Sequence, residues 1–200
     1  GWRVWEGSAV HASEVEVSAG LAARRPWFDS LVTYGAHSGA ELIPGSAKKL
    51  GFRAVVMGVW NPADDREVEN AVAAWKAHPD IVAGVSLGNE MVLSGRGTWA
   101  DLEKAIGKFR DRAPGLPLTV TEPFATYLDG ADAVPVLAKL DFLAVNVHPV
   151  FEKWFADAPP FNWADFVKQV TSRLAAPLTV PTVLPGDIVG AGVAAQHTKT

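Results

Sequence analysis

The sequence contains no cysteine, which excludes a disulfide framework and leaves the redox compartment undefined. It has no run of basic residues and a formal net charge of −4 at pH 7, which argues against nucleic acid as the main partner. No apolar stretch approaches the length of a membrane-spanning helix, and neither GxGxxG nor GxxxxGK(S/T) occurs. The usual sequence signs of a nucleic-acid-binding, membrane-spanning or nucleotide-binding protein are therefore missing, and we expect no cofactor and no metal ion.

Apolar residues, in contrast, are plentiful. Of the 200 residues 48% are hydrophobic and 20% are charged, which indicates a soluble globular protein with one domain over residues 1–200. The eight tryptophans are unusual for this length. Tryptophan lines sites for carbohydrates and other flat ligands, although it is more often part of the core. No signal peptide is apparent, so a processed end or an excised piece of a longer protein would each account for a chain that begins at Gly1.

Apolar runs alternate with amphipathic stretches, the pattern of parallel strands joined by helices. The expected strands are residues 28–34, 52–60, 81–88, 118–121, 142–147 and 178–184, with residues 2–8 as a seventh candidate. The expected helices are residues 39–50, residues 64–77, a helix that opens at Thr98, and residues 163–174. The Thr98 hydroxyl can cap its helix, because Asp101 occupies the position where a capping box needs an acid.

Polar residues lie at the carboxyl ends of successive predicted strands. They are Tyr34, Asn61, Asn89, Glu90, Glu122, Asn146 and His148. A TIM barrel gathers its active site at that face from several different strands, whereas an open doubly wound sheet concentrates its site near one switch point. The distribution over many strand ends favours an α/β fold of the (β/α)8 TIM-barrel type.

Glu90 follows the apolar run of residues 81–88 and comes directly after Asn89. Hydrolysis of a glycosidic bond needs a carboxylic acid that protonates the leaving oxygen and a second carboxylate that attacks or activates water. Glu90 suits the acid role, and the amide of Asn89 can hold a sugar hydroxyl. The alternative is that Glu90 is an acid at the N-terminus of the next helix, where it would suit the helix macrodipole equally well. The other strand-end residues favour the catalytic interpretation.

Five segments resemble, in order and spacing, those of glycoside hydrolase family 17, the bacterial, fungal and plant β-1,3-glucanases and related glucan transglycosylases. The segments are WFDSLVTYG, AKKLGFRAVVMGVW, AGVSLGNEMVLSG, LPLTVTEPF and DFLAVNVHPVFEKW. The resemblance spans roughly residues 12–196. The GNE segment recurs across many related barrel glycosidases, but the ordered set of five is specific to this family.

The resemblance implies a barrel that acts on β-glucan with retention, with the acid/base after strand four and the nucleophile after strand seven. It places Glu90 on the acid/base and Asn89 on the amide that contacts the sugar next to the cleaved bond. Glu122 falls on a strand-five carboxylate of the family's cleft and is the second catalytic candidate.

The resemblance also implies substrate contacts from other strand ends. The matching residues are Tyr34, Asn146 and His148 along the cleft, and Phe124 and Phe151 where aromatic contacts to sugars are expected. Two of them have a plain structural alternative. His148 precedes Pro149 and would then only order a turn, and Phe151 would only pack.

One segment departs from the family pattern. The seventh strand of the family typically ends in Glu-Thr-Gly-Leu/Trp-Pro, whose Glu is the nucleophile, and the matching stretch here is VPTVLPGDIVGAGVAAQ. This alignment puts Pro181 on the nucleophile, and proline has neither a charge nor a lone pair suited to attacking an anomeric carbon. Glu122 and Asp187 are the nearest carboxylates in the sequence that could substitute. Residues 186–200 are too few for a helix and an eighth strand, so we expect an incomplete barrel with an open seam beside its first strand.

Three interpretations follow from these features. The chain is a β-1,3-glucan hydrolase or transglycosylase, a non-catalytic relative that binds β-glucan oligo- or polysaccharides, or a truncated remnant without activity. Pro181 favours the second and third, whereas the intact Asn89, Glu90 and Glu122 favour the first and second. The family usually meets glucan outside the cytoplasm, so an extracellular or periplasmic location is expected.

Overall fold

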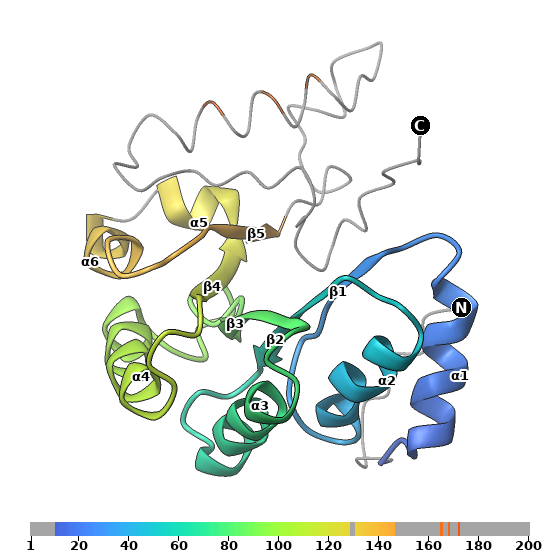
Figure 1. Cartoon of the computed structure of the whole chain (residues 1–200). Coiled ribbons are helices and arrows are strands. Elements are labelled where there is room, and N and C mark those ends of the chain that lie inside the picture. The colour runs from blue at the N-terminus through green and yellow to red at the C-terminus, as the bar shows by residue number, and fades with distance from the viewer. Residues whose placement is uncertain (1–10, 129–130, 147–164, 166–167, 169–171, 173–200) are drawn as a thin grey trace.

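The computed structural model of the protein describes residues 11–128, 131–146, 165, 168 and 172 (Figure 1). Helices and strands alternate along the chain. In order they are α1 Glu14–Arg24, β1 Ser30–Val32, η1 Ala40–Leu42, α2 Ile43–Lys49, β2 Ala54–Val59, α3 Asp65–Ala77, β3 Val82–Asn89, α4 Trp99–Arg112, β4 Leu118–Pro123, α5 Phe124–Leu128, η2 Ala131–Ala133, α6 Val134–Leu137 and β5 Ala144–Asn146.

The five strands form one parallel sheet in the order β1-β2-β3-β4-β5. Figure 1 shows the strands on a curve with the helices along its outer side. Each strand lies beside its neighbour in sequence, and a helical segment connects them, as in a (β/α)8 barrel. The described strands make a curled half-barrel, which confirms the expected fold class.

The strands expected within the described range are all present, with shifted ends. Residues 28–34 shorten to β1 and residues 142–147 to β5, whereas the strand expected at residues 118–121 continues to Pro123. The strand candidates at residues 2–8 and 178–184, and most of the expected helix at residues 163–174, lie outside the described residues. The open seam therefore stays a prediction.

Helix ends follow the local sequence. The predicted capping box of α4 is confirmed, with the Thr98 hydroxyl accepting from the N–H of Asp101 and the Asp101 carboxylate accepting from the N–H of Thr98. Helix α1 was not predicted, although Ser13 and Glu16 form the same capping box at its start and could have indicated it. The predicted helix of residues 39–50 is a 3-10 turn followed by α2, and the chain then turns at Gly51 with φ 77°.

Successive side chains along each strand point to opposite sides of the sheet, so the buried residues form two separate hydrophobic clusters. On β2, Val55, Met57 and Val59 belong to the main cluster between the sheet and the helices. Val56 points to the opposite, inner side, where it packs with Phe142 and Ala144 in a much smaller cluster. The large core therefore lies on the outer side of the sheet, and the inner side carries polar residues beyond its small apolar cluster.

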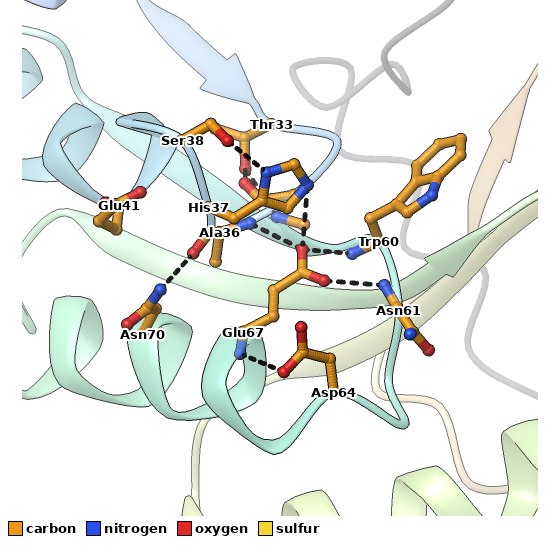
Figure 2. Close-up of polar contacts among 12 residues, drawn as sticks. Thr33, Ala36, His37, Ser38, Glu41, Trp60, Asn61, Asp64, Glu67 and Asn70 are labelled. Carbon is orange, nitrogen blue, oxygen red and sulfur yellow. Dashed lines mark hydrogen bonds and ion pairs between the residues drawn. The ribbon is translucent and has the colours of Figure 1, made fainter. Parts of the chain in front are cut away.

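A buried carboxylate joins two loops at the carboxyl ends of β1 and β2 (Figure 2). Glu67 of α3 is 3% exposed and accepts hydrogen bonds from the backbone N–H groups of Ala36, Trp60 and Asn61, at 3.0, 2.7 and 2.9 Å. A Cβ atom at Gly35 would lie 2.8 Å from Oε1 of Glu67, so the loop can approach the carboxylate only with glycine there. The three hydrogen bonds offset the cost of burying the charge and hold both loops in place.

Replacing Glu67 tests this role. We expect Glu67→Ala to lower the free energy of unfolding by about 3 kcal/mol or more, because three backbone N–H groups lose their acceptor. Glu67→Gln keeps the shape and one good acceptor, and should cost roughly 1–3 kcal/mol. Denaturant unfolding measures both. Glu69→Gln, on the exposed face of the same helix, is the matched control, and an equal effect at both positions would contradict the proposed role of Glu67.

Candidate active site

A break in strand geometry at the end of β3 turns Asn89 and Glu90 inward. Val85 and Leu87 face the main core, so regular alternation would point residue 89 toward the helices as well. Gly88 adopts φ 75°, and the pairing of β3 with β4 shifts between Ser86 and Asn89. Such bulges re-aim the side chains that follow them. Glu90 itself has φ 52°, an uncommon value for a residue with a side chain.

The amide of Asn146 joins Asn89 and Glu90 on the inner side. Its Nδ2 atom donates to Oδ1 of Asn89 at 3.0 Å and to Oε1 of Glu90 at 2.8 Å. Asn146 is 2% exposed, and its own Oδ1 is buried without a hydrogen-bond partner. Because the oxygen of Asn89 accepts from Asn146, the nitrogen of Asn89 is the atom it presents to other partners. Asn89 and Glu90 are half-buried and so remain accessible.

The backbone around Glu90 is held on both sides. Its N–H donates to the carbonyl of Thr121 on β4 at 2.8 Å, and its carbonyl accepts from the N–H of Ser94 at 3.0 Å. Helix α4 begins later, at Trp99, and has its own cap at Thr98. Glu90 therefore does not stand in the first turn of a helix, and the alternative of a macrodipole acid is wrong.

Tyr34 lies at the same edge of the sheet, just after β1. It is 42% exposed. Burial of the rest of its side chain, and then the negative charge of Glu90, raise the pKa of Tyr34 above its usual 10.0. Tyr34 thus follows β1 at the same carboxyl edge of the sheet as Asn89, Glu90 and Asn146, the last three of which are joined by hydrogen bonds.

Glu122 occupies a different environment. It is 1% exposed, and its carboxylate accepts from the backbone N–H groups of Val92 and Leu93 at 2.9 and 3.2 Å. On β4, Glu122 lies on the same face of the strand as Leu118 and Val120, and these two residues belong to the main core. Burial raises the pKa of Glu122 above its usual 4.5 and the charge of Glu90 adds to this, against the lowering effect of the hydrogen bonds from backbone N–H groups. The carboxylate thus secures the turn after Glu90 instead of lining the inner side.

Two other predicted positions also have structural partners. Phe124 is 4% exposed and belongs to the main core, so its ring offers little surface to a ligand. Asn61 accepts from the N–H of Ala63 at 3.1 Å and thereby closes the turn that leads to α3. The predicted contacts His148 and Phe151, and the unusual Pro181, lie outside the described residues.

Two residues that sequence reasoning missed border the site. Trp60 follows β2, is 40% exposed, and lies under the guanidinium of Arg96, whose Cζ is 4.1 Å from the ring centroid. Arg96 also donates from Nη2 to the carbonyl of Asn89 at 2.5 Å. An aromatic residue at a strand end was the available signal, but Trp60 read as the last residue of an apolar strand.

Other kinds of site find no support within the described ranges. Residues 11–128 and 131–146 hold no group of three or more His, Cys, Asp or Glu side chains placed to bind a metal ion. In the same part of the chain, no helix combines the length and apolarity needed to cross a membrane.

Comparison with known proteins finds relatives among enzymes of β-1,3-glucan. A glucan 1,3-beta-glucosidase of Arthroderma benhamiae is 28% identical over 132 residues, which are 64% of this chain and 42% of that protein. The structure of a glycoside hydrolase family 17 β-1,3-glucanosyltransferase from Rhizomucor miehei matches with a TM-score of 0.66 and 16% identity. An active-site mutant of that enzyme in complex with laminaritriose matches with the same TM-score and 18% identity.

These matches confirm the resemblance to glycoside hydrolase family 17 and set its extent. The Rhizomucor miehei structures cover 86% of this chain, whereas this chain covers 64% of theirs. The chain therefore spans less than two thirds of the length of these relatives. A profile of the BtgE/BtgC glycoside hydrolase domain matches residues 6–184, a stretch that includes every described strand. The chain belongs to the BtgE/BtgC glycoside hydrolase domain family.

Proposed function

We propose that this chain binds or acts on β-1,3-glucan at the carboxyl edge of the half-barrel, with Glu90 as the acid/base. The observation that carries this proposal is the Asn146 amide, which holds Asn89 and Glu90 together on the inner side of the sheet. Support for the substrate comes from relatives named for β-1,3-glucan chemistry and from the laminaritriose complex of one of them.

The chemistry follows from the placement of Glu90. In its protonated form it would donate a proton to the glycosidic oxygen as the bond to the anomeric carbon breaks, and the carboxylate would then accept a proton from water. The Nδ2 atom of Asn89 would donate to a hydroxyl of the adjacent sugar. Glu122 supports Glu90 by holding the N–H groups of Val92 and Leu93 just after it. The retaining route of the family needs a nucleophile in addition.

A second candidate function is binding without cleavage, and Pro181 favours it. A proline at the aligned nucleophile position cannot form the glycosyl-enzyme intermediate of a double displacement. Affinity for sugar depends instead on hydrogen bonds and aromatic faces, which the missing nucleophile leaves intact.

The first test separates these two functions. We expect the unmodified chain to cleave laminari-oligosaccharides at or near the background rate and to bind them in calorimetry. Pro181→Glu should raise the cleavage rate, because it restores a carboxylate where the family alignment places the nucleophile. Robust cleavage by the unmodified chain would show that another carboxylate attacks. Absence of both cleavage and binding would refute the proposed function.

The acid/base role of Glu90 is tested in the Pro181→Glu background. Adding Glu90→Gln should lower cleavage of laminari-oligosaccharides by about 10²–10⁴-fold, since general acid catalysis contributes on that order. The loss should be much smaller for an aryl glucoside whose leaving group needs no proton. Binding should persist, because glutamine still offers Asn146 an acceptor. Glu69→Gln serves as the control, and equal losses on both substrates would contradict the role of Glu90 as the acid.

The burial of Glu122 predicts a specific pH dependence of stability. Its pKa is raised in the folded protein, so the folded state binds the proton more tightly and this stabilisation is lost as the pH rises from about 4.5 through the folded pKa. Glu122→Gln cannot titrate. The free energy of unfolding of the variant minus that of the unmodified chain should therefore increase over this window and then level off. Denaturant unfolding at several pH values measures this difference in free energy. A difference that falls as the pH rises would contradict a raised pKa of Glu122.

A further inference from the structure

The carboxyl ends of β1 and β2 carry two exposed aromatic side chains next to each other in the sheet. Tyr34 is 42% and Trp60 is 40% exposed. The parallel register pairs Val32 with Val56, so the chain just after β1 runs beside Gly58. A Cβ atom at Gly58 would lie 2.2 Å from the carbonyl oxygen of Thr33 and 2.5 Å from the carbonyl carbon of Tyr34. Glycine is required there, and it lets the two strand ends approach closely.

Trp60 is fixed from several directions although its ring is exposed. Its backbone N–H donates to the buried Glu67 carboxylate at 2.7 Å (Figure 2). The guanidinium of Arg96 covers one face of the ring, with Cζ 4.1 Å from the centroid, and Nη1 donates to the Trp60 carbonyl at 3.4 Å. Figure 2 shows the ring directed away from Glu67. An aromatic ring held in this way loses little conformational freedom when a ligand stacks on it.

Arg96 links Trp60 to the residues of the candidate site. Its Nη2 atom donates to the carbonyl of Asn89, the residue before Glu90. The Trp60 ring therefore lies one side chain away from the segment that carries the proposed acid. By contrast, Trp99 is 8% exposed and packs against Tyr127 with ring centroids 5.7 Å apart, as a core tryptophan does. Packing accounts for Trp99 but not for the exposure of Trp60.

Resting on the proposed function, we propose that Trp60 is a stacking platform for one sugar ring of the bound β-1,3-glucan, on the face opposite Arg96. The substituents of a β-glucose ring lie equatorial, so both of its faces consist of C–H groups that pack well on a flat aromatic surface. The positive charge of Arg96 on the other face holds the plane of the indole. The platform extends the candidate site from the inner side at Glu90 toward the ends of β1 and β2.

The experiment compares tryptophans in the intact chain. Calorimetry with laminari-oligosaccharides is performed on the unmodified protein, Trp60→Ala, Trp60→Phe and the control Trp27→Ala. Trp27 is 77% exposed and precedes β1, so it belongs to the amino ends of the strands. We expect the affinity to fall by about tenfold or more for Trp60→Ala and by an intermediate factor for Trp60→Phe. The affinity of Trp27→Ala should be unchanged.

A fluorescence measurement makes the result specific to the ring. The change in tryptophan emission on ligand binding should be reduced in Trp60→Phe and retained in Trp27→Phe. Thermal unfolding of each variant establishes that it is folded. If Trp60→Ala is not folded, Trp60→Phe alone tests the platform. If the unmodified chain binds and both Trp60 variants bind equally well, the platform is refuted and the proposed function stands. If the unmodified chain binds none of these oligosaccharides, both fail.

Discussion

The hydrogen bonds from Asn146 to Asn89 and Glu90 require a particular curvature and a particular strand end from the rest of the half-barrel. Asn146 belongs to β5, whereas Asn89 and Glu90 lie at the end of β3, with β4 between them. One amide can join strands that are not neighbours only if the sheet is strongly curled, so that inner side chains converge. The twist of the parallel strands gives the sheet that curl, and the large core between the sheet and the helices lies on its outer side. The contact further requires the bulge at Gly88, which turns Asn89 inward.

Two buried carboxylates fix the loops that surround this contact. Glu67 binds the backbone of the loops after β1 and β2, and Glu122 binds the turn after β3. Each accepts several N–H groups, which is the arrangement that makes a buried charge tolerable. Removing either acceptor would leave backbone donors unpaired in the interior. The two carboxylates thus make the connections after β1, β2 and β3 parts of the scaffold, whereas Glu90 remains half-buried.

The sequence predicted the strands and the polar edge well, because apolar runs and their ends depend on local pattern. It could not tell which side of the sheet each strand-end residue faces. The inward turn of Asn89 depends on a left-handed Gly88, and the burial of Glu122 and Phe124 depends on β4 continuing to Pro123. The turn of Asn89 is a tertiary effect that alternation of residues does not encode, whereas the position of Glu122 follows from alternation once β4 is known to continue to Pro123. The structural role of Glu67 could not be predicted either, since an acid in the first turn of a helix is equally consistent with a favourable interaction with the helix macrodipole.

The contacts that position the candidate site are distinct from the group that would attack the substrate, so affinity and turnover depend on different residues. Trp60, Asn89 and Asn146 are positioned by contacts to Arg96, to each other and to the buried carboxylates, and none of these contacts involves Pro181. The cost of ordering the loops is therefore met by folding and not by the ligand. Substitution of a nucleophile removes an interaction made with the reacting carbon, whereas the surfaces that recognise sugar stay formed. On the proposed function, sugar binding would persist where cleavage is lost, because the contacts that shape the site also stabilise the fold.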